Sequence, residues 1–433
     1  MKYEHSDDRV PQQAYHHRSK ILSSAIEHYQ KIKKNSGFTS PECFANFLDD
    51  THLITRITDL AKEKESYKVK HMFVVGIGGA NLASKAIYDV LYGHTQSIKQ
   101  PKQNIVFLDT DDESVHDELR QYVESFKSKK EYIVIVVSKS GETLETITNA
   151  KLITGLLEKK FGSSNDRIIV ITKPDSPLAH SAEESGITTV RTPESLSDRF
   201  SAFSPICLIP LAFLGVDIQE FLSGARSARD ESLNIDIYQN PAALSACAID
   251  YHAEGGARII DLFYFVPALK TLGEWNRQLI AESLGKSTTR DAVALGKTVT
   301  PVVSVGTTDL HSILQLTLSD PLGRFTQFVT SEETLSHDPM DTSVFDTLIP
   351  TTNAKSTHEI VTAIYKSVKQ SYRTQKMAHV EVGLSDVSVR SLGEYMMFSM
   401  MSTVYVGALW NIDSFTQPMV EAYKTNARDI LSK

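Results

Sequence analysis

Short apolar runs alternate with amphipathic segments of helical period in the first half of this chain. The four runs are MFVVGIGG (72–79), NIVFLDTDD (104–112), YIVIVVSKSGET (132–143) and RIIVITKPDS (167–176). A strand that is buried on both faces of a parallel sheet is apolar throughout, and its alternation with helices indicates βαβ units. We therefore predict an α/β fold with a parallel sheet in this half.

The same alternation returns in the second half. Strands are expected within ARIIDLFYFVPAL (257–269), TVTPVVSVGTTDL (298–310), FTQFVTSEE (325–333) and FDTLIPTTN (345–353). Residues up to about Tyr67 have helical spacings, and the residues after Asp386 indicate two helices around the turn-like NIDSFTQP. The predicted division is a helical N-terminal segment (1–68), a first α/β domain (69–230), a second α/β domain (231–386) and C-terminal helices (387–433).

One apolar stretch, MMFSMMSTVYVGALW (396–410), has to be weighed as a membrane span. It is shorter than the roughly 20 residues that a spanning helix needs, and it contains the polar Ser399 and Ser402. We expect a buried core helix instead, and no membrane association. The polar N-terminal MKYEHSDDRVPQQ has no apolar core, so it does not indicate a signal peptide.

Composition narrows the kinds of partner. The 433 residues carry a net charge of −8 and no long basic run, which disfavours a nucleic-acid binder. Three cysteines without a C-x-x-C spacing indicate neither a disulfide framework nor a thiolate zinc site, and they fit a reducing compartment. The common metal motifs do not occur in the sequence, so no metal and no cofactor are expected.

Glycines follow the first apolar run directly. Gly76, Gly78 and Gly79 stand between a strand and a helix, where backbone N–H groups can approach a phosphate. A tight turn between strand and helix would explain them equally well. A dinucleotide fold is a third interpretation, because Asp109 ends the next strand as a ribose acceptor would, although that fingerprint needs a glycine where this chain has Asn81.

A run rich in hydroxyl groups follows the third apolar run. Ser138, Lys139, Ser140 and Thr143 occupy a strand-to-helix turn, where hydroxyls and free N–H groups can hold an anion. Helix capping alone needs one hydroxyl, and here there are three. With the glycines in the same sheet, this favours a phosphorylated small ligand at the carboxyl ends of the strands.

Four further segments are less specific by themselves. In GEWNRQLIAESLGK (273–286), Gln278 and Glu282 are four residues apart and share a helix face near a stop at Gly285. The others are DRFS (198–201), GTTDLHS (306–312) and FTQPMVEAYK (415–424). Each also has an ordinary structural interpretation: a surface helix, an ion pair or a helix start.

Taken together and in this order, the six segments resemble the glucose-6-phosphate isomerase family. The resemblance runs from about Val74 to Lys424, in GIGG, SKSGETLET, RFSxxSP, EWxxQLxxESxGK, TDLHSxxQ and FxQPxVExxK. It implies two sugar-isomerase (SIS-type) domains, each a doubly wound parallel sheet, in a cytoplasmic homodimer of glycolysis and gluconeogenesis without a metal cofactor. The activity it implies is the reversible aldose–ketose isomerisation of D-glucose 6-phosphate to D-fructose 6-phosphate.

The resemblance also assigns roles to single residues. Glu282 matches the base that moves a proton between C1 and C2, and Arg199 matches the cation beside the enediolate. His311 and Lys424 match the groups that open the sugar ring, with His311 supplied by the partner subunit. The substrate-binding positions are Gly78, Gly79, Ser138, Lys139, Ser140, Thr143, Glu145, Gln278 and Gln417.

Two places depart from the family pattern. Ala80 stands where the family usually has Ser, which removes a hydroxyl from the expected phosphate site. Ser197 and Asp198 replace Gly-Gly before Arg199, and we expect the Asp198 side chain to turn away and cap a helix. The alternatives are an isomerase that also accepts mannose 6-phosphate, a non-catalytic sugar-phosphate-binding protein and the dinucleotide enzyme.

Overall fold

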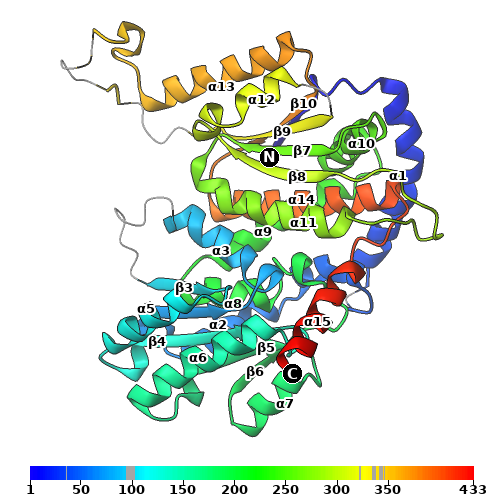
Figure 1. The fold of residues 1–433 in the computed structure, drawn as a ribbon. Coiled ribbons are helices and arrows are strands. Elements are labelled where there is room, and N and C mark those ends of the chain that lie inside the picture. Colours follow the sequence, from blue (N-terminus) through cyan, green and yellow to red (C-terminus); the bar gives the residue numbers. More distant parts are fainter. Residues whose placement is uncertain (36, 94–102, 321–322, 334–337, 341–344, 346) are drawn as a thin grey trace.

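Two five-stranded sheets form the two halves of the molecule, and helices lie between and around them (Figure 1). The computed structural model describes residues 1–35, 37–93, 103–320, 323–333, 338–340, 345 and 347–433. The α/β class with parallel sheets, predicted from the alternation of apolar runs and helical segments, is confirmed.

The first sheet has the strand order β3-β2-β4-β5-β6, and all its strands are parallel. The central strand β4 is buried along its whole length, which is why its sequence is an unbroken apolar run. The edge strand β6 escapes the sequence pattern because it is four residues long, three of them polar, and none of them is fully buried. The strands are β2 (His71–Val75), β3 (Asn104–Leu108), β4 (Tyr132–Val137), β5 (Ile168–Thr172) and β6 (Thr188–Arg191), with helices α3 (Leu82–Tyr88), α5 (Glu113–Glu124), α6 (Leu144–Phe161) and α7 (Pro177–Glu184) between or beside them.

The second sheet has the order β1-β10-β9-β7-β8. Its strands are parallel except β1, which runs antiparallel to β10 at the edge. The elements are β1 (Lys2–Glu4), β7 (Ile259–Tyr264), β8 (Thr300–Val305), β9 (Arg324–Ser331) and β10 (His379–Leu384), with α12 (Leu314–Ser319) and α13 (Thr357–Thr374) on the outer side.

The second sheet corrects the sequence prediction at three points. The N-terminal segment is not purely helical, since Lys2–Glu4 form β1. The stretch 345–353 is not a strand in its described residues: Pro350–Thr352 form a short 3₁₀ turn, and Pro350 cannot donate to a sheet. The strand beside β9 is instead β10, which the sequence pattern did not reveal.

Helices α9 (Ile218–Ser232), α11 (Lys270–Leu284) and α14 (Val389–Leu409) lie between the two sheets, and α8 (Pro205–Phe213) and α10 (Pro241–Glu254) pack against this group. α14 is buried along most of its length, so the prediction of a core helix for 396–410 is confirmed. No helix in the described part of the chain is long and apolar enough to cross a membrane.

Two glycines allow α9 and α14 to approach each other closely. A Cβ at Gly224 would overlap the carbonyl of Arg390, and a Cβ at Gly393 would overlap the carbonyl of Phe221. Because both obstacles are backbone atoms, neither can move aside without separating the helices. The helix pair at the centre of the molecule therefore depends on these two glycines.

The remaining helices surround this centre: α1 (Gln12–Lys33), α2 (Leu53–Glu63) and the C-terminal α15 (Glu421–Leu431). Buried Asp250 of α10 fixes α1 by accepting a hydrogen bond from Arg18 Nε at 2.7 Å. The same carboxylate accepts from Lys297 Nζ at 2.6 Å and from Trp410 Nε1 at 2.8 Å. α15, in contrast, has no buried residue.

Candidate active site

Arg199 is the buried centre of the candidate site. It lies in the short 3₁₀ turn Asp198–Phe200, and its side chain is 3% exposed. Its guanidinium donates from Nε to Ser283 Oγ at 2.8 Å, from Nη2 to the Ser414 carbonyl at 2.7 Å and from Nη1 to Gln417 Oε1 at 2.7 Å. One planar cation thus joins the first half of the chain to α11 and to the segment after α14.

Glu282 lies beside this cation. It occupies the last turn of α11, where its Oε2 is 3.4 Å from Arg199 Nη1 and its Oε1 accepts from Gln278 Nε2 at 3.1 Å. The prediction that Gln278 and Glu282 share a helix face is confirmed. One third of the Glu282 side chain is exposed (33%), so a ligand can reach the carboxylate that the protein holds in place.

The glycine loop packs directly against these groups. Gly78 has φ +59°, and a Cβ there would lie 2.8 Å from Gln278 Nε2. A Cβ at Gly79 would overlap the backbone between Asp198 and Arg199. The loop therefore needs glycine both for its left-handed turn and for its approach to the Arg199 turn.

Asp109 does not offer a free carboxylate to a ribose. Its Oδ2 accepts from Lys85 Nζ at 2.8 Å and lies 3.5 Å from Asn81 Nδ2. Asn81 also donates to the Gly76 carbonyl at 2.6 Å, so it braces the glycine loop. These contacts favour a structural role for Asp109 over the dinucleotide interpretation.

The hydroxyl-rich turn after β4 forms a small network of its own. Ser138 Oγ lies 3.0 Å from Thr143 Oγ1 and accepts from the Gly141 N–H at 3.1 Å. Ser140 Oγ accepts from the Glu142 N–H at 3.2 Å. No side chain caps α6 at Thr143, so its first N–H groups remain available to an anion.

Lys139 stands out within this turn. Burial lowers the pKa of Lys139. Among the described residues, no hydrogen bond or ion pair reaches its ammonium group. A half-buried cation without a partner beside free helix N–H groups is suited to bind a phosphate.

Several polar atoms around the site lack a partner although they are buried. They are Gln278 Oε1, Asp198 Oδ1 and Thr146 Oγ1. A buried polar group left without a hydrogen bond costs about 1–3 kcal/mol. Unsatisfied atoms gathered around Glu282, Arg199 and the hydroxyl-rich turn are typical of a site that a polar ligand completes.

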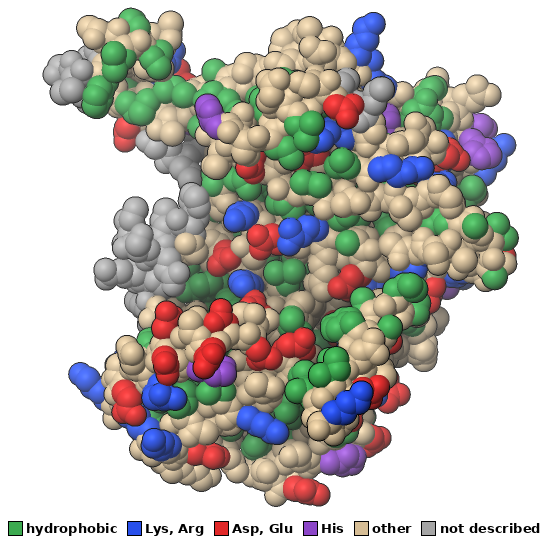
Figure 2. All heavy atoms as spheres, in the orientation of Figure 1, with side chains coloured by type: hydrophobic (Ala, Val, Ile, Leu, Met, Phe, Trp, Pro, Cys, Tyr) green, Lys and Arg blue, Asp and Glu red, His purple; other side chains and the backbone are tan. Residues whose placement is uncertain are grey.

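Figure 2 shows basic and acidic side chains close together in the middle of the face between the two halves.

The capping role expected for Asp198 is wrong. The residue begins the turn Asp198–Phe200, and neither it nor Ser197 makes a side-chain capping bond there. Burial raises the pKa of Asp198, while the charges of Lys139 and Arg199 act in the opposite direction. Asp198 thus lies within the influence of the site's cations, and its backbone packs directly against Gly79 of the glycine loop.

Comparison with known proteins identifies the family. Residues 59–433 match the family model described as phosphoglucose isomerase. The chain belongs to the phosphoglucose isomerase family. The resemblance found in the six sequence segments is thereby confirmed.

Relatives in the family match most of this chain. It is 29% identical over 366 residues to a protein named glucose-6-phosphate isomerase from Methanocaldococcus jannaschii, covering 84% of this chain and 85% of the relative. It is 30% identical to the glucose-6-phosphate isomerase of Leptospira interrogans, covering 88% and 84%. In fold it resembles hypothetical protein TT0462 from Thermus thermophilus (TM-score 0.86, 23% identity, all of both chains) and a glucose-6-phosphate isomerase from Chlamydia trachomatis (TM-score 0.82, 20% identity, 99% and 88%).

Lys286 is a member of the family segment at 273–286 whose role the sequence did not indicate. Its Nζ donates to the carbonyl of Glu282 at 2.7 Å and to the carbonyl of Ser283 at 3.1 Å. These carbonyls lie in the last turn of α11, where no further helical N–H can pair with them. Burial, together with the nearby Arg199 charge, lowers the pKa of Lys286 to about 8. The sequence signal that could have indicated this role is a lysine directly after Gly285, the glycine that ends the helix.

Two family positions, Lys424 and His311, make no direct contact with the Glu282–Arg199 pair in the described part of the chain. Lys424 lies on α15, is 39% exposed and pairs with Glu421 at 2.7 Å. His311 is exposed at the end of the 3₁₀ turn Thr308–His311. Within the described residues, no hydrogen bond or ion pair links either of them to Glu282 or Arg199.

The last predicted position, Glu145, lies in the first turn of α6 and is half-buried. Its charge acts on Asp111, whose pKa burial and Glu145 raise. It is part of the same strand-to-helix turn as Lys139 but makes no hydrogen bond to the Glu282–Arg199 pair in the described residues.

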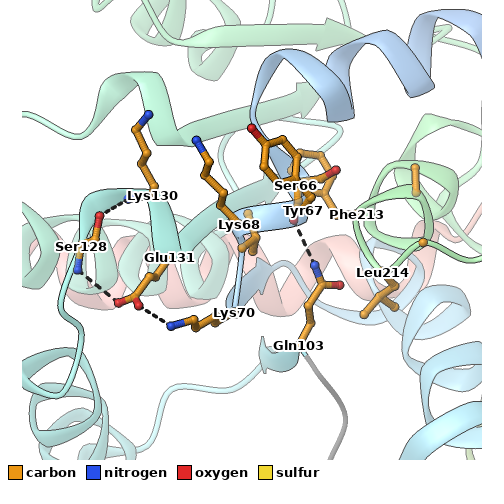
Figure 3. A pocket seen from close by; sticks show the side chains of 13 residues that line it. Ser66, Tyr67, Lys68, Lys70, Gln103, Ser128, Lys130, Glu131, Phe213 and Leu214 are labelled. Atoms are coloured by element: carbon orange, nitrogen blue, oxygen red, sulfur yellow. Dashed lines mark hydrogen bonds and ion pairs between the residues drawn. The ribbon is translucent and has the colours of Figure 1, made fainter.

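A cavity of about 770 Å³ lies at a different place, at the amino ends of β2 and β4 (Figure 3). Its walls include Lys68, Lys70, Lys130 and Phe213. Lys70 pairs with Glu131 at 2.6 Å, and the other two lysines pair with Glu65. This cavity contains none of the residues that the sequence assigns to the site.

Proposed function

We propose that the protein interconverts D-glucose 6-phosphate and D-fructose 6-phosphate. The observation that carries the proposal is the accessible carboxylate of Glu282 held beside the buried guanidinium of Arg199. Aldose–ketose isomerisation needs one base that can move a proton between adjacent carbons, and one fixed cation for the oxyanion that forms. Both requirements are met by this pair.

In the proposed reaction, Glu282 removes the proton from C2 of the open-chain aldose. The electrons of the C2–H bond form the C1=C2 double bond, and the aldehyde oxygen becomes the negative oxygen of a cis-enediolate. Arg199 stabilises this charge from a direction fixed by its bonds to Ser283 and Ser414. Glu282 then returns the proton to C1, and the hydroxyl proton on O2 moves to O1, which yields the ketose.

The phosphate is placed by residues remote from these carbons. We assign it to the N–H groups around Gly78 and Gly79 and to the turn that carries Ser138 and Lys139. Binding energy from this remote group positions C1 and C2 at the base. Ala80, which lacks the usual family hydroxyl, makes this site weaker without affecting the proton transfer.

Ring opening requires His311 and Lys424, which stand apart from Glu282 in one chain. We propose a homodimer in which His311 of the partner subunit enters each site, while α15 brings Lys424 from the same chain. α15 already reaches the hydroxyl-rich turn, since Arg428 Nη2 donates to the Glu142 carbonyl at 3.3 Å. We further place the enzyme in the cytoplasm, in glycolysis and gluconeogenesis, and we keep the division at residues 68, 230 and 386.

The decisive experiment is turnover by purified protein. Fructose 6-phosphate should be converted to glucose 6-phosphate, and the assay detects this product by its coupled oxidation. Mannose 6-phosphate in the same assay tests whether C2 stereochemistry is lost. Binding of fructose 6-phosphate without any turnover would contradict the proposal and leave a sugar-phosphate-binding protein.

A subunit-mixing experiment tests the shared site. Glu282→Gln and His311→Ala are each expected to be inactive. Hybrid dimers should recover one intact site per dimer, because each chain supplies the residue that the other lacks. Verified subunit exchange without recovered activity would contradict the contribution of His311 in trans.

A further inference from the structure

The Asp198 carboxylate is unusual because it lies within a cluster of charges but makes no hydrogen bond to any residue that the structure describes. Its Oδ1 is buried without a partner, and no hydrogen bond reaches its side chain from the described residues. The neighbouring Arg199 does not satisfy it, since that guanidinium is directed at Ser283, Ser414 and Gln417. A half-buried carboxylate in this condition is costly to keep unless something else completes its bonds.

Lys139 is the other unsatisfied charge. Of the charged groups that act on Asp198, Lys139 has the largest influence, and Asp198 likewise has the largest influence on Lys139. No ion pair joins the two side chains in the described part of the chain. The two opposite charges therefore act on each other, but neither side chain satisfies the other among the described residues.

Both residues belong to the site already described. Asp198 begins the Arg199 turn and packs on Gly79, while Lys139 lies in the turn after β4. The charge of Glu282 also acts on Asp198. A ligand bound between Lys139 and Asp198 would meet a cation at one end and a hydrogen-bond acceptor at the other.

We propose that Asp198 is a specificity-determining residue that accepts a hydrogen bond from a hydroxyl of the sugar carbon chain while Lys139 holds the phosphate. The proposal rests on the proposed function, because it assumes a phosphorylated polyol as ligand. It assigns a use to a residue that departs from the family's Gly-Gly pattern. A carboxylate at this place favours a phosphate that carries a hydroxylated chain over a bare phosphate, which it only repels.

The two ligand classes should therefore respond to loss of Asp198 in opposite directions. Asp198→Gly removes an acceptor for fructose 6-phosphate, and a hydrogen bond to a charged group corresponds to about 10- to 100-fold in affinity. The same change removes a negative charge near Lys139, so inorganic phosphate should bind several-fold more tightly. Asp198→Asn, which keeps an amide oxygen as acceptor, should recover part of the sugar-phosphate affinity.

Titration calorimetry of the full chain with fructose 6-phosphate and with inorganic phosphate measures both effects without requiring turnover. Glu194→Gln is the matched control, because exposed Glu194 also acts on Lys139. It should tighten the binding of both ligands slightly, because it removes a negative charge near Lys139 without removing a hydrogen-bond acceptor from the sugar. Opposite shifts in Asp198→Gly, together with this control, support the proposal.

Three results would overturn it. Weaker binding of both ligands would indicate that Asp198 only maintains the loop. Tighter binding of both would indicate a charge effect without a hydrogen bond, and unchanged binding would indicate that Asp198 does not face the ligand. Failure of the proposed function is distinguishable, since it would appear as wild-type protein that binds fructose 6-phosphate with the expected pattern but does not isomerise it.

Discussion

Lysines gather at both ends of the strands of the first sheet, which we call the amino edge and the carboxyl edge. The lysines at the amino edge are paired with glutamates, and the lysine at the carboxyl edge is not paired in the part of the chain that the structure describes. At the amino ends of β2 and β4, the cavity of about 770 Å³ is lined by Lys68, Lys70 and Lys130, and each of them has a glutamate partner. At the carboxyl ends, Lys139 is half-buried and has no such partner among the described residues. The more conspicuous hollow is thus the one whose charges are already neutralised.

The titration behaviour of the groups follows the same division. At the amino edge, hydrogen bonds from Lys68 and Lys130 lower the pKa of Glu65 to about 2, and Lys70 does the same for Glu131. At the carboxyl edge, burial instead lowers the pKa of Lys139 and raises that of Asp198. Satisfied pairs favour their charged forms, whereas unsatisfied groups are disfavoured as charges until a ligand arrives.

This difference teaches that a hollow alone is weak evidence for a site. What separates the two edges is strand direction, because the carboxyl ends of parallel strands meet helix N-termini with free N–H groups. The amino ends receive the chain returning from the preceding helices and can pair their charges locally. Five changes would break or sharpen this comparison.

The largest effect is expected for Glu282→Gln at the carboxyl edge. The amide keeps the shape of the side chain but cannot accept a proton from carbon, so kcat should fall by about 10²–10⁴-fold. Affinity for inorganic phosphate should not change. Glu274→Gln, two turns earlier on α11, is the control and should retain full turnover. Near-normal kcat in Glu282→Gln would remove the base from the mechanism.

Arg199→Lys should have the next largest effect. Lysine keeps the charge but not the planar fork that bonds Ser283, Ser414 and Gln417 together, and loss of one preorganised donor typically costs about 10²–10³ in kcat. Thermal unfolding should be measured alongside, since buried carbonyls lose their donors. Exposed Arg277→Lys is the control. A raised KM with unchanged kcat would show that Arg199 binds substrate without stabilising the enediolate.

The two lysines at opposite ends of β4 give a direct contrast. Lys139→Ala should raise KM for fructose 6-phosphate by about 10- to 100-fold, the scale of a charge-assisted hydrogen bond, with kcat little changed. Lys130→Ala, at the amino end, should leave KM within about twofold, because its surface ion pair with Glu65 contributes little. Equal effects in steady-state kinetics would erase the distinction between the edges.

Lys286→Met should lower kcat by about 10-fold. The carbonyls of Glu282 and Ser283 lose their donor, so the last turn of α11, which carries Glu282, is held less firmly. In wild type, kcat/KM should also fall as the pH rises through about 8, where Lys286 loses its proton and a cation near the enediolate disappears. Lys286→Arg should retain turnover and move this fall to higher pH. If kcat/KM falls at the same alkaline pH in wild type, Lys286→Met and Lys286→Arg, the fall belongs to another group.

The linked effect on stability has the opposite sign. The folded-state pKa of Lys286 lies below its ordinary value of 10.5, so between about pH 8 and 10.5 the unfolded chain binds the proton that the folded chain has lost. The contribution of this group to the free energy of unfolding therefore rises with pH over that window. Lys286→Met should lack this rise in denaturant titrations.

The smallest effect is expected for two serines that flank β4, Ser138 after its carboxyl end and Ser128 before its amino end. Ser138→Ala removes one neutral hydroxyl next to the proposed phosphate position, so KM should rise only several-fold while Lys139 and the backbone N–H groups remain. Ser128→Ala, before the amino end of β4, removes a capping-box hydroxyl and should lower stability by about 1 kcal/mol without changing KM. A raised KM in Ser128→Ala together with an unchanged KM in Ser138→Ala would contradict binding of the phosphate at the carboxyl ends of the strands.

Much of the candidate site can be predicted from sequence because its parts are local. The alternation of apolar and helical segments places Gly78 and Ser138 at the ends of β2 and β4, and strand direction then brings them to one edge. The i, i+4 spacing places Gln278 beside Glu282. Of the strands that the pattern misses, β1 and β6 are short and lie at an edge of a sheet, whereas β10 is an interior strand whose apolar residues are interrupted by His379 and Glu381.

The amino-acid sequence by itself determined the α/β class, the strand-end loops and the family, because each depends on residues close together in the chain. Only the tertiary structure decided that Arg199 is held by Ser283, Ser414 and Gln417 from distant segments, that Lys286 anchors the end of α11, and that Asp198 and Lys139 are left without partners among the described residues. Hydrogen bonds and charge interactions depend on positions in space, and the packing of the glycine loop on the backbone of the Arg199 turn brings Asp198 into the site.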